Sequence, residues 1–288
     1  MLTKKTIGFI GGGNLAEALI KGLISSKIAS PANIIVSDSA AARLVHIAGT
    51  YEVKAFTKNF ETARNADIIF LAVKPKDAAN AVLEIAPELD GKKVVISAVA
   101  GVTTGAIASW AASDRKDSIH PPIIRAMPNT PVIVREGMTA LFAGEYVRQE
   151  HLKLAKAVFK AVGKVIVIED EALMDAVTGL SGSGPAYVFL VMESMMNAGI
   201  KLGLSADDAK TLALQTTLGA AALAGQGTHT LTELRRMVAS PGGTTIEGLK
   251  KLEQGGLAGV IEAAINAAAT RATEISKEVS GAPGPDKK

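Results

Sequence analysis

The chain has 288 residues, a formal net charge of +3 at pH 7 and no cysteine. This length is enough for two ordinary domains, and the lack of cysteine excludes disulfides, thiolate metal ligands and a cysteine nucleophile. The mild charge and an aromatic content of 4% argue against a nucleic-acid partner, which needs clustered cations or stacking platforms. The four histidines are widely separated along the chain, so we expect no bound metal.

The sequence also lacks the pattern of a membrane segment. No stretch approaches the roughly 20 apolar residues that span a bilayer. The N-terminal stretch MLTKKTIGFIGGG begins like a signal peptide, but its apolar run is short and breaks into three glycines. We therefore expect a cytoplasmic protein.

Short β-branched runs alternate with helix-length segments through the first part of the chain. The predicted strands are TIGFIG (6–11), NIIVSD (33–38), ADIIFLAV (66–73), KVVISAVA (93–100) and IIRAMP (123–128), and the segments between them include helices at 14–26 and 76–87. Near-continuous apolar runs are typical of parallel strands covered on both faces. The alternation predicts an α/β domain with a doubly wound, Rossmann-like sheet.

The pattern changes near residue 170. Two further predicted strands, 137–144 and 163–170, bracket a helical stretch at 150–161, and residues 171–277 contain no convincing strand. We predict a dinucleotide-binding domain over 1–169, an all-helical C-terminal domain over 170–280 and a disordered tail over 281–288. The helix after Pro185 has little polar surface, which predicts that it is buried in its own domain or against another subunit.

A glycine-rich turn follows the first predicted strand. IGFIGGGNLAEAL places Gly11, Gly12 and Gly13 after that strand and Ala16 in the next helix, the G-x-G-x-x-A form of the dinucleotide fingerprint. Gly11 makes the tight turn, Gly13 admits a pyrophosphate, and the helix N-terminus attracts its negative charge. A plain glycine turn is the less favoured alternative.

Asp38 ends the second predicted strand, about 20 residues beyond the fingerprint. An acid there commonly bonds the adenosine ribose 2′-hydroxyl and favours NAD. Ser37, Ser39 and Arg43 could instead surround the 2′-phosphate of NADP, and Asp38 could be a solvated cap. The choice between NADPH and NADH stays open at this level.

Lys74 lies in AVKPKD, directly after the third predicted strand. Strand ends on this side of the sheet face the cofactor crevice, so Lys74 could enter the site. Equally, it could be a surface lysine ahead of a helix whose first residue is Pro75.

A second glycine-rich helix entrance lies at SPGGTTIEGL (240–249). Thr244 and Glu247 could form a T-x-x-E capping box, with Gly242 and Gly243 making the turn. A cap needs only one threonine, whereas paired glycines expose successive backbone amides that can bind a carboxylate or phosphate. We favour a site for an anionic ligand.

Taken together, these motifs resemble one family. IGFIGGGN, AVKP, RAMPNTP (125–131), VTGLSGSGPAYVF (177–189) and SPGGTTIEGL stand in the order found in Δ1-pyrroline-5-carboxylate reductases, and the similarity runs from about residue 6 to residue 275. The resemblance implies an NAD(P)H-dependent reductase that makes L-proline from a cyclic imine, the last step of proline biosynthesis. It also implies a homodimer, or a higher homo-oligomer, formed through the C-terminal helices.

The resemblance further implies the site residues. With Asp38 added, those near the cofactor are Gly11, Gly12, Gly13, Asn14, Leu15, Ser37, Asn59, Ala72, Val73, Lys74, Pro75, Ala98, Val99 and Ala100. Those near the substrate are Gly242, Gly243, Thr244 and Thr245. Thr245 is expected to orient the ring nitrogen, and Lys74 to add favourable charge near the anion, so both are catalytic candidates.

Two rival functions are weaker. A β-hydroxyacid dehydrogenase resembles this plan but carries a lysine base about four residues after a similar glycine cluster, where this chain has Val188 after Gly184. A non-catalytic dinucleotide-binding sensor should have a damaged substrate loop, and SPGGTT is intact.

Overall fold

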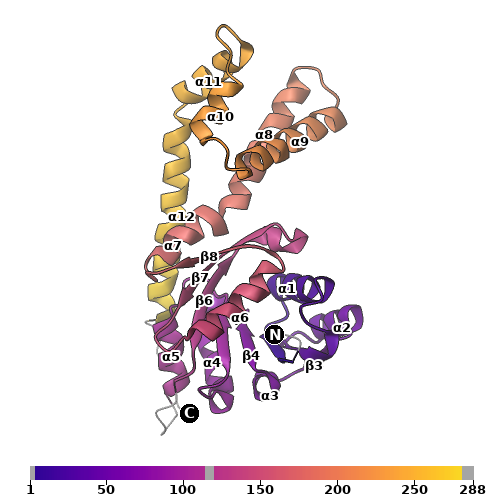
Figure 1. Ribbon diagram of the computed structural model, residues 1–288, viewed down its shortest axis with the longest axis vertical. Helices are drawn as coiled ribbons and strands as arrows, with labels where there is room; N and C mark the ends of the chain where they lie inside the picture. The colour runs from indigo at the N-terminus through magenta and orange to yellow at the C-terminus, as the bar shows by residue number, and fades with distance from the viewer. Residues whose placement is uncertain (1–3, 114–119, 281–288) are drawn as a thin grey trace. The chain divides into compact units, whose positions relative to one another are not determined.

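The computed structural model describes residues 4–113 and 120–280, which Figure 1 colours from the N-terminus to the C-terminus. The chain divides into two compact units: the first holds residues up to Gly182 and those from Ala267 onward, and the second holds Ser183–Asn266. The predicted boundary at residues 169–170 stays a prediction, and the predicted tail at 281–288 lies outside the described residues.

The first unit is built on one eight-stranded sheet in the order β3-β2-β1-β4-β5-β6-β7-β8. The strands are β1 (Ile7–Ile10), β2 (Ile34–Ser37), β3 (Lys54–Phe56), β4 (Ile68–Leu71), β5 (Val94–Ser97), β6 (Ile123–Pro128), β7 (Gly137–Ala143) and β8 (Gly163–Ile168). All neighbours pair in parallel except β6 and β7. Strand order reverses between β1 and β4, which is the position where doubly wound sheets bind ligands. The predicted Rossmann-like sheet is therefore confirmed.

Helices cover both faces of this sheet. The helices are α1 (Asn14–Ser25), α2 (Ala41–Tyr51), α3 (Asn59–Asn65), α4 (Ala78–Ile85), α5 (Thr104–Ala112), α6 (Gln149–Lys160) and α7 (Leu173–Val177). Alternate strand residues such as Phe9 and Phe70 pack with α1, α2 and α6, whereas Ile69 and Val95 pack with α3, α4 and α5. Gly8 allows close packing on β1, because a Cβ there would lie 2.8 Å from the Ala66 Cβ at the end of α3.

The end of the last helix, α12 (Leu257–Ser280), belongs to the first unit. Ala272 is 3% exposed, and Thr273 donates a hydrogen bond of 2.9 Å to Asp175. Gly101 has φ +72°, and a Cβ on it would lie 2.8 Å from Ile275 Cγ2. The residues after 266 therefore complete the unit that holds the sheet.

The second unit is helical throughout. It contains α8 (Gly184–Lys201), α9 (Ala206–Gly225), α10 (Leu231–Met237), α11 (Thr244–Gln254) and the first turns of α12. Within the described part of the chain, no strand follows Ile168, which confirms the predicted all-helical C-terminal region. No described helix is both long and apolar enough to cross a membrane.

The apolar helix α8 is not buried within a single chain. It packs beside α9, as Figure 1 shows, but none of its residues is buried and Phe189 is 60% exposed. Of the two predicted alternatives, burial in its own domain is therefore wrong, because no residue of α8 is buried within the chain. Burial against another subunit stays a prediction.

Candidate active site

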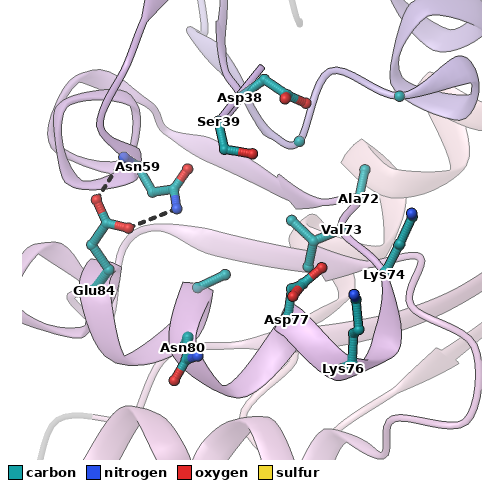
Figure 2. Close-up of a pocket in the computed structure, with 13 residues that line it drawn as sticks. Asp38, Ser39, Asn59, Ala72, Val73, Lys74, Lys76, Asp77, Asn80 and Glu84 are labelled. Carbon is teal, nitrogen blue, oxygen red and sulfur yellow. Dashed lines mark hydrogen bonds between the residues drawn. The ribbon is translucent and has the colours of Figure 1, made fainter. Parts of the chain in front are cut away.

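A pocket of about 500 Å³ lies where β1, β2 and β4 end. Its lining residues are Gly11, Gly13, Asp38, Ser39, Asn59, Ala72, Val73, Lys74, Lys76, Asp77, Asn80, Ala81 and Glu84. Figure 2 shows Asp38 and Ser39 on one side of this pocket and Lys74, Lys76 and Asp77 on the facing side. The pocket therefore occupies the switch point of the sheet.

The glycine turn beside the pocket fits a dinucleotide. Gly11 has φ +96°, and a Cβ on it would lie 2.7 Å from the carbonyl oxygen of Ala72. Gly13, by contrast, has nothing within 4 Å of its Cβ position. Gly13 is the N-cap of α1 and no side chain caps this helix, so the first-turn amides are left for an anion. The turn thus provides the open approach and the amides that a pyrophosphate needs.

Asp38 binds the backbone at the end of β2. Its Oδ2 accepts a hydrogen bond of 2.7 Å from the amide of Gly12, and its Oδ1 accepts one of 2.8 Å from the amide of Ala40. The carboxylate is half-buried and lines the pocket. These two bonds fix a negative charge at the position from which an acid reaches the adenosine ribose.

Ser37 does not reach the pocket. It is fully buried, and its hydroxyl donates to Asn59 Oδ1 over 2.9 Å. Asn59 is held in turn by Glu84. The two carboxylate oxygens of Glu84 accept hydrogen bonds from the backbone amide of Asn59 and from its side-chain Nδ2, as the dashed lines in Figure 2 show. Ser37 therefore orients Asn59, and Asn59 faces the pocket.

Several predicted cofactor residues lie outside the lining of this pocket. They are Gly12, Asn14, Leu15, Ser37, Pro75, Ala98, Val99 and Ala100. Leu15 packs against the core, and Val99 is 2% exposed. Ser39, which the sequence offered only as a 2′-phosphate contact, does line the pocket, and five further lining residues were not predicted: Lys76, Asp77, Asn80, Ala81 and Glu84. Asp77, Asn80, Ala81 and Glu84 recur at helical spacing, and that periodicity could have found them.

The second glycine-rich entrance is built differently from the predicted capping box. Helix α11 begins at Thr244, its N-cap is Gly243, and no side chain caps it. The capping-box interpretation is therefore wrong: the threonine stands one residue inside the helix, and Glu247 instead accepts a hydrogen bond from Lys250 Nζ. Gly242 has φ +72°, and the amide of Gly243 bonds the carbonyl of Ser240, so the glycines do make the turn.

This arrangement leaves the first-turn amides of α11 uncapped. Thr244 and Thr245 are both exposed. An uncapped helix entrance with exposed hydroxyls can take a carboxylate on its amides and a further polar atom on a hydroxyl. Over the ranges 4–113 and 120–280, no group of three or more His, Asp or Glu side chains is placed to hold a metal ion.

Comparison with known proteins connects both glycine-rich entrances to one family. Residues 171–275 match the family model for pyrroline-5-carboxylate reductase dimerisation, and residues 6–101 match the model described as NADP oxidoreductase, coenzyme F420-dependent. The chain is 38% identical to a pyrroline-5-carboxylate reductase of Pseudomonas aeruginosa, covering 95% of this chain and 97% of that one. It is 41% identical to one of Synechocystis, covering 94% and 98%. The chain belongs to the pyrroline-5-carboxylate reductase family.

Solved structures of the family have the same fold. A pyrroline-5-carboxylate reductase of Coxiella burnetii is 40% identical, with a TM-score of 0.87 and coverage of 95% of this chain and 99% of that chain. The Plasmodium falciparum enzyme, solved with NADP bound, is 30% identical, with a TM-score of 0.85 and coverage of 96% and 100%. The resemblance found in the sequence motifs is thus confirmed along nearly the whole chain.

Proposed function

We propose that this chain transfers a hydride from NAD(P)H to the C=N bond of 1-pyrroline-5-carboxylate and so forms L-proline, the last step of proline biosynthesis. The supporting observation is its similarity, over nearly its whole length, to proteins named for this reaction. Both glycine-rich helix entrances lie inside the matched segments. The proposed partner is therefore a small cyclic imino acid.

In this proposal the first unit binds the cofactor. The Gly11–Gly13 turn and the uncapped start of α1 hold the pyrophosphate, and Asp38 faces the adenosine ribose. Asn59, Ala72 and Val73 line the rest of the pocket. When bound, the cofactor supplies the hydride. The task of these residues is to position and orient it.

The start of α11 binds the substrate in the same proposal. The amides from Gly243 to Thr245 take the carboxylate, and the hydroxyl of Thr245 orients the ring nitrogen. A C=N carbon accepts hydride more readily when its nitrogen is protonated. The substrate is an imine and carries no reacting hydroxyl, so no side chain has to remove a hydroxyl proton. Lys74, which is exposed and lines the pocket, adds positive charge near the substrate anion.

We also propose that two copies associate through the C-terminal helices. The dimerisation model covers residues 171–275, and α8 exposes a continuous apolar stretch that includes Phe189 and Leu190. Burying such a stretch against a second copy removes apolar area from water. We propose separately that the protein is cytoplasmic.

The test is a direct assay. The purified chain is mixed with NADH or NADPH and 1-pyrroline-5-carboxylate, and both the reduced nicotinamide absorbance and proline are followed. One proline formed for each cofactor oxidised is the expected result. Cofactor binding without turnover would contradict the proposal and favour the sensor. A 3-hydroxy acid with oxidised cofactor is the control, and its oxidation would favour the dehydrogenase.

A further inference from the structure

The carboxylate of Asp38, at the end of strand β2, accepts hydrogen bonds from the nearby backbone amides. The two carboxylate oxygens of Asp38 accept from the amides of Gly12 and Ala40, over 2.7 and 2.8 Å. A 2′-phosphate on the adenosine ribose would approach this charge and would find those two amides already bonded. A ribose 2′-hydroxyl, by contrast, can donate to the carboxylate.

One candidate cation for a 2′-phosphate is Arg43, in the first turn of α2, and it is already paired. Its Nε donates to the carbonyl of Gly12 over 2.8 Å, and its Nη2 donates to Glu17 Oε2 over 2.7 Å. The Arg43 side chain is 32% exposed and that of Glu17 is 21% exposed. A phosphate that recruited Arg43 would have to compete with a partly buried carboxylate.

Glu17 is itself held in place on α1. Its Oε1 lies 2.8 Å from His46 Nε2 and accepts from the Tyr51 hydroxyl over 3.1 Å. Desolvation raises the pKa of Glu17, but the hydrogen bonds from Arg43, His46 and Tyr51 and the charge of Arg43 outweigh it and lower this pKa to about 2. The carboxylate is thus ionised at neutral pH. Lys74 and Lys76 lie on the facing side of the pocket, away from Asp38 (Figure 2).

From this geometry we propose that the chain prefers NADH to NADPH, with Asp38 binding the ribose and Glu17 acting as a positioning residue that keeps Arg43 from a 2′-phosphate. The proposal rests on the proposed function for its cofactor. It adds the choice between the two cofactors and a residue, Glu17, that lies outside the pocket lining and controls that choice through Arg43.

The test measures binding without turnover. Calorimetry compares ADP-ribose with 2′-phospho-ADP-ribose, neither of which carries a nicotinamide. The wild-type chain should bind ADP-ribose at least about tenfold more tightly, and Asp38→Asn, which removes the charge, should cut this ratio about tenfold. Equal or tighter binding of the phosphorylated ligand by the wild-type chain would overturn the proposal.

Variants of the Glu17–Arg43 pair test the positioning role. Glu17→Gln should move the ratio several-fold toward the phosphorylated ligand, and adding Arg43→Ala should cancel that gain. Arg43→Ala alone should leave the wild-type ratio unchanged, which tests the role even if Glu17→Gln fails to fold. Glu88→Gln breaks a matched pair, Arg64–Glu88, also at 2.7 Å, and should not change the ratio. The positioning role would be overturned if a folded Glu17→Gln variant kept the wild-type ratio. It would also be overturned if Arg43→Ala lost affinity for the phosphorylated ligand alone.

The outcomes separate this proposal from the proposed function. Failure to reduce 1-pyrroline-5-carboxylate, with the expected binding ratio intact, would contradict the function and support the preference. Proline formation that is faster with NADPH at low cofactor concentration would support the function and overturn the preference.

Discussion

Arg125 Nη2 lies 3.0 Å from Asp175 Oδ1, and the arginine side chain is only 4% exposed. A second carboxylate, Glu171, lies 3.6 Å from Nη1. Asp175 also accepts a hydrogen bond from Thr273, and Glu171 accepts two from Thr104. One buried guanidinium on β6 thus connects α7 to the start of α5 and to the end of the last helix.

Replacing Arg125 with methionine should destabilise the protein. The change keeps much of the side-chain volume but leaves two carboxylates without their buried partner, and such a loss typically costs about 3 kcal/mol of unfolding free energy. Urea denaturation measures it. Arg271→Met is the control, because Arg271 is exposed where it pairs with Glu274 and Glu278, and its loss should not be measurable. Equal losses in both variants would contradict the role of burial.

Gly11→Ala and Gly13→Ala should separate folding from cofactor binding. Gly11 has positive φ and a carbonyl oxygen 2.7 Å from its Cβ position, so alanine should cost at least about 1 kcal/mol of stability. Gly13 has free space and φ −69°, so alanine there should leave the melting temperature unchanged. It should still weaken cofactor binding about tenfold, because its methyl group takes the space of the pyrophosphate. Wild-type cofactor affinity in Gly13→Ala would count against this site.

Thr245→Ala should lower turnover at least about tenfold, which corresponds to losing one transition-state hydrogen bond of about 1.4 kcal/mol. Thr245→Ser keeps the hydroxyl and should retain most of the activity. Steady-state assays with saturating cofactor measure both variants. Unchanged turnover in the alanine variant would remove Thr245 from the mechanism.

Phe189→Glu should disrupt the oligomer. Phe189 is 60% exposed on α8, and a charge buried at an interface there would lack a partner. Val45→Glu is the matched control, because Val45 is 74% exposed on α2, outside the matched dimerisation segment. Light scattering should show dimers or larger assemblies for the wild type and the control, and monomers for Phe189→Glu. A stable wild-type monomer at micromolar concentration would refute the assembly.

Glu17 should make the free energy of unfolding depend on pH in the acidic range. Its pKa in the folded chain, about 2, lies below the ordinary value of 4.5. The ionised group therefore stabilises the fold at pH values above 4.5. That contribution is lost as pH falls from 4.5 toward 2, because Glu17 then takes up a proton in the unfolded chain but not in the folded one. The difference in unfolding free energy between wild type and Glu17→Gln should therefore shrink below about pH 4.5. A difference that stays constant across this range would contradict the assignment.

The sequence predicted the parts of the fold that depend on local pattern. Apolar runs marked seven of the eight strands, and the exception, β3, is a three-residue strand with exposed and half-buried side chains and no apolar run. Gly11 was predictable because a tight turn after a buried strand needs positive φ. The role of Ser37 was not, because its bond to Asn59 joins residues that only the folded sheet brings together.

Single-residue shifts also limited the prediction of the site. Whether Gly243 or Thr244 occupies the cap position depends on one pair of backbone angles, and the same letters fit both choices. The pairing of Arg43 with Glu17 joins two helices separated by a strand, so no local pattern reveals it. The sequence alone therefore could not show that Arg43 is already paired with a carboxylate, and the structure was needed to see it.

The position of α12 has a consequence for synthesis on the ribosome. Residues 267–280 complete the unit that holds the sheet, yet the whole second unit is translated before them. Until they emerge, the surface around Gly101 lacks Ile275, and Asp175 lacks Thr273. A nascent chain at this stage lacks the apolar cover that Ile275 gives to the surface around Gly101. A premature stop after residue 266 would thus damage a unit whose entire sheet has already been translated.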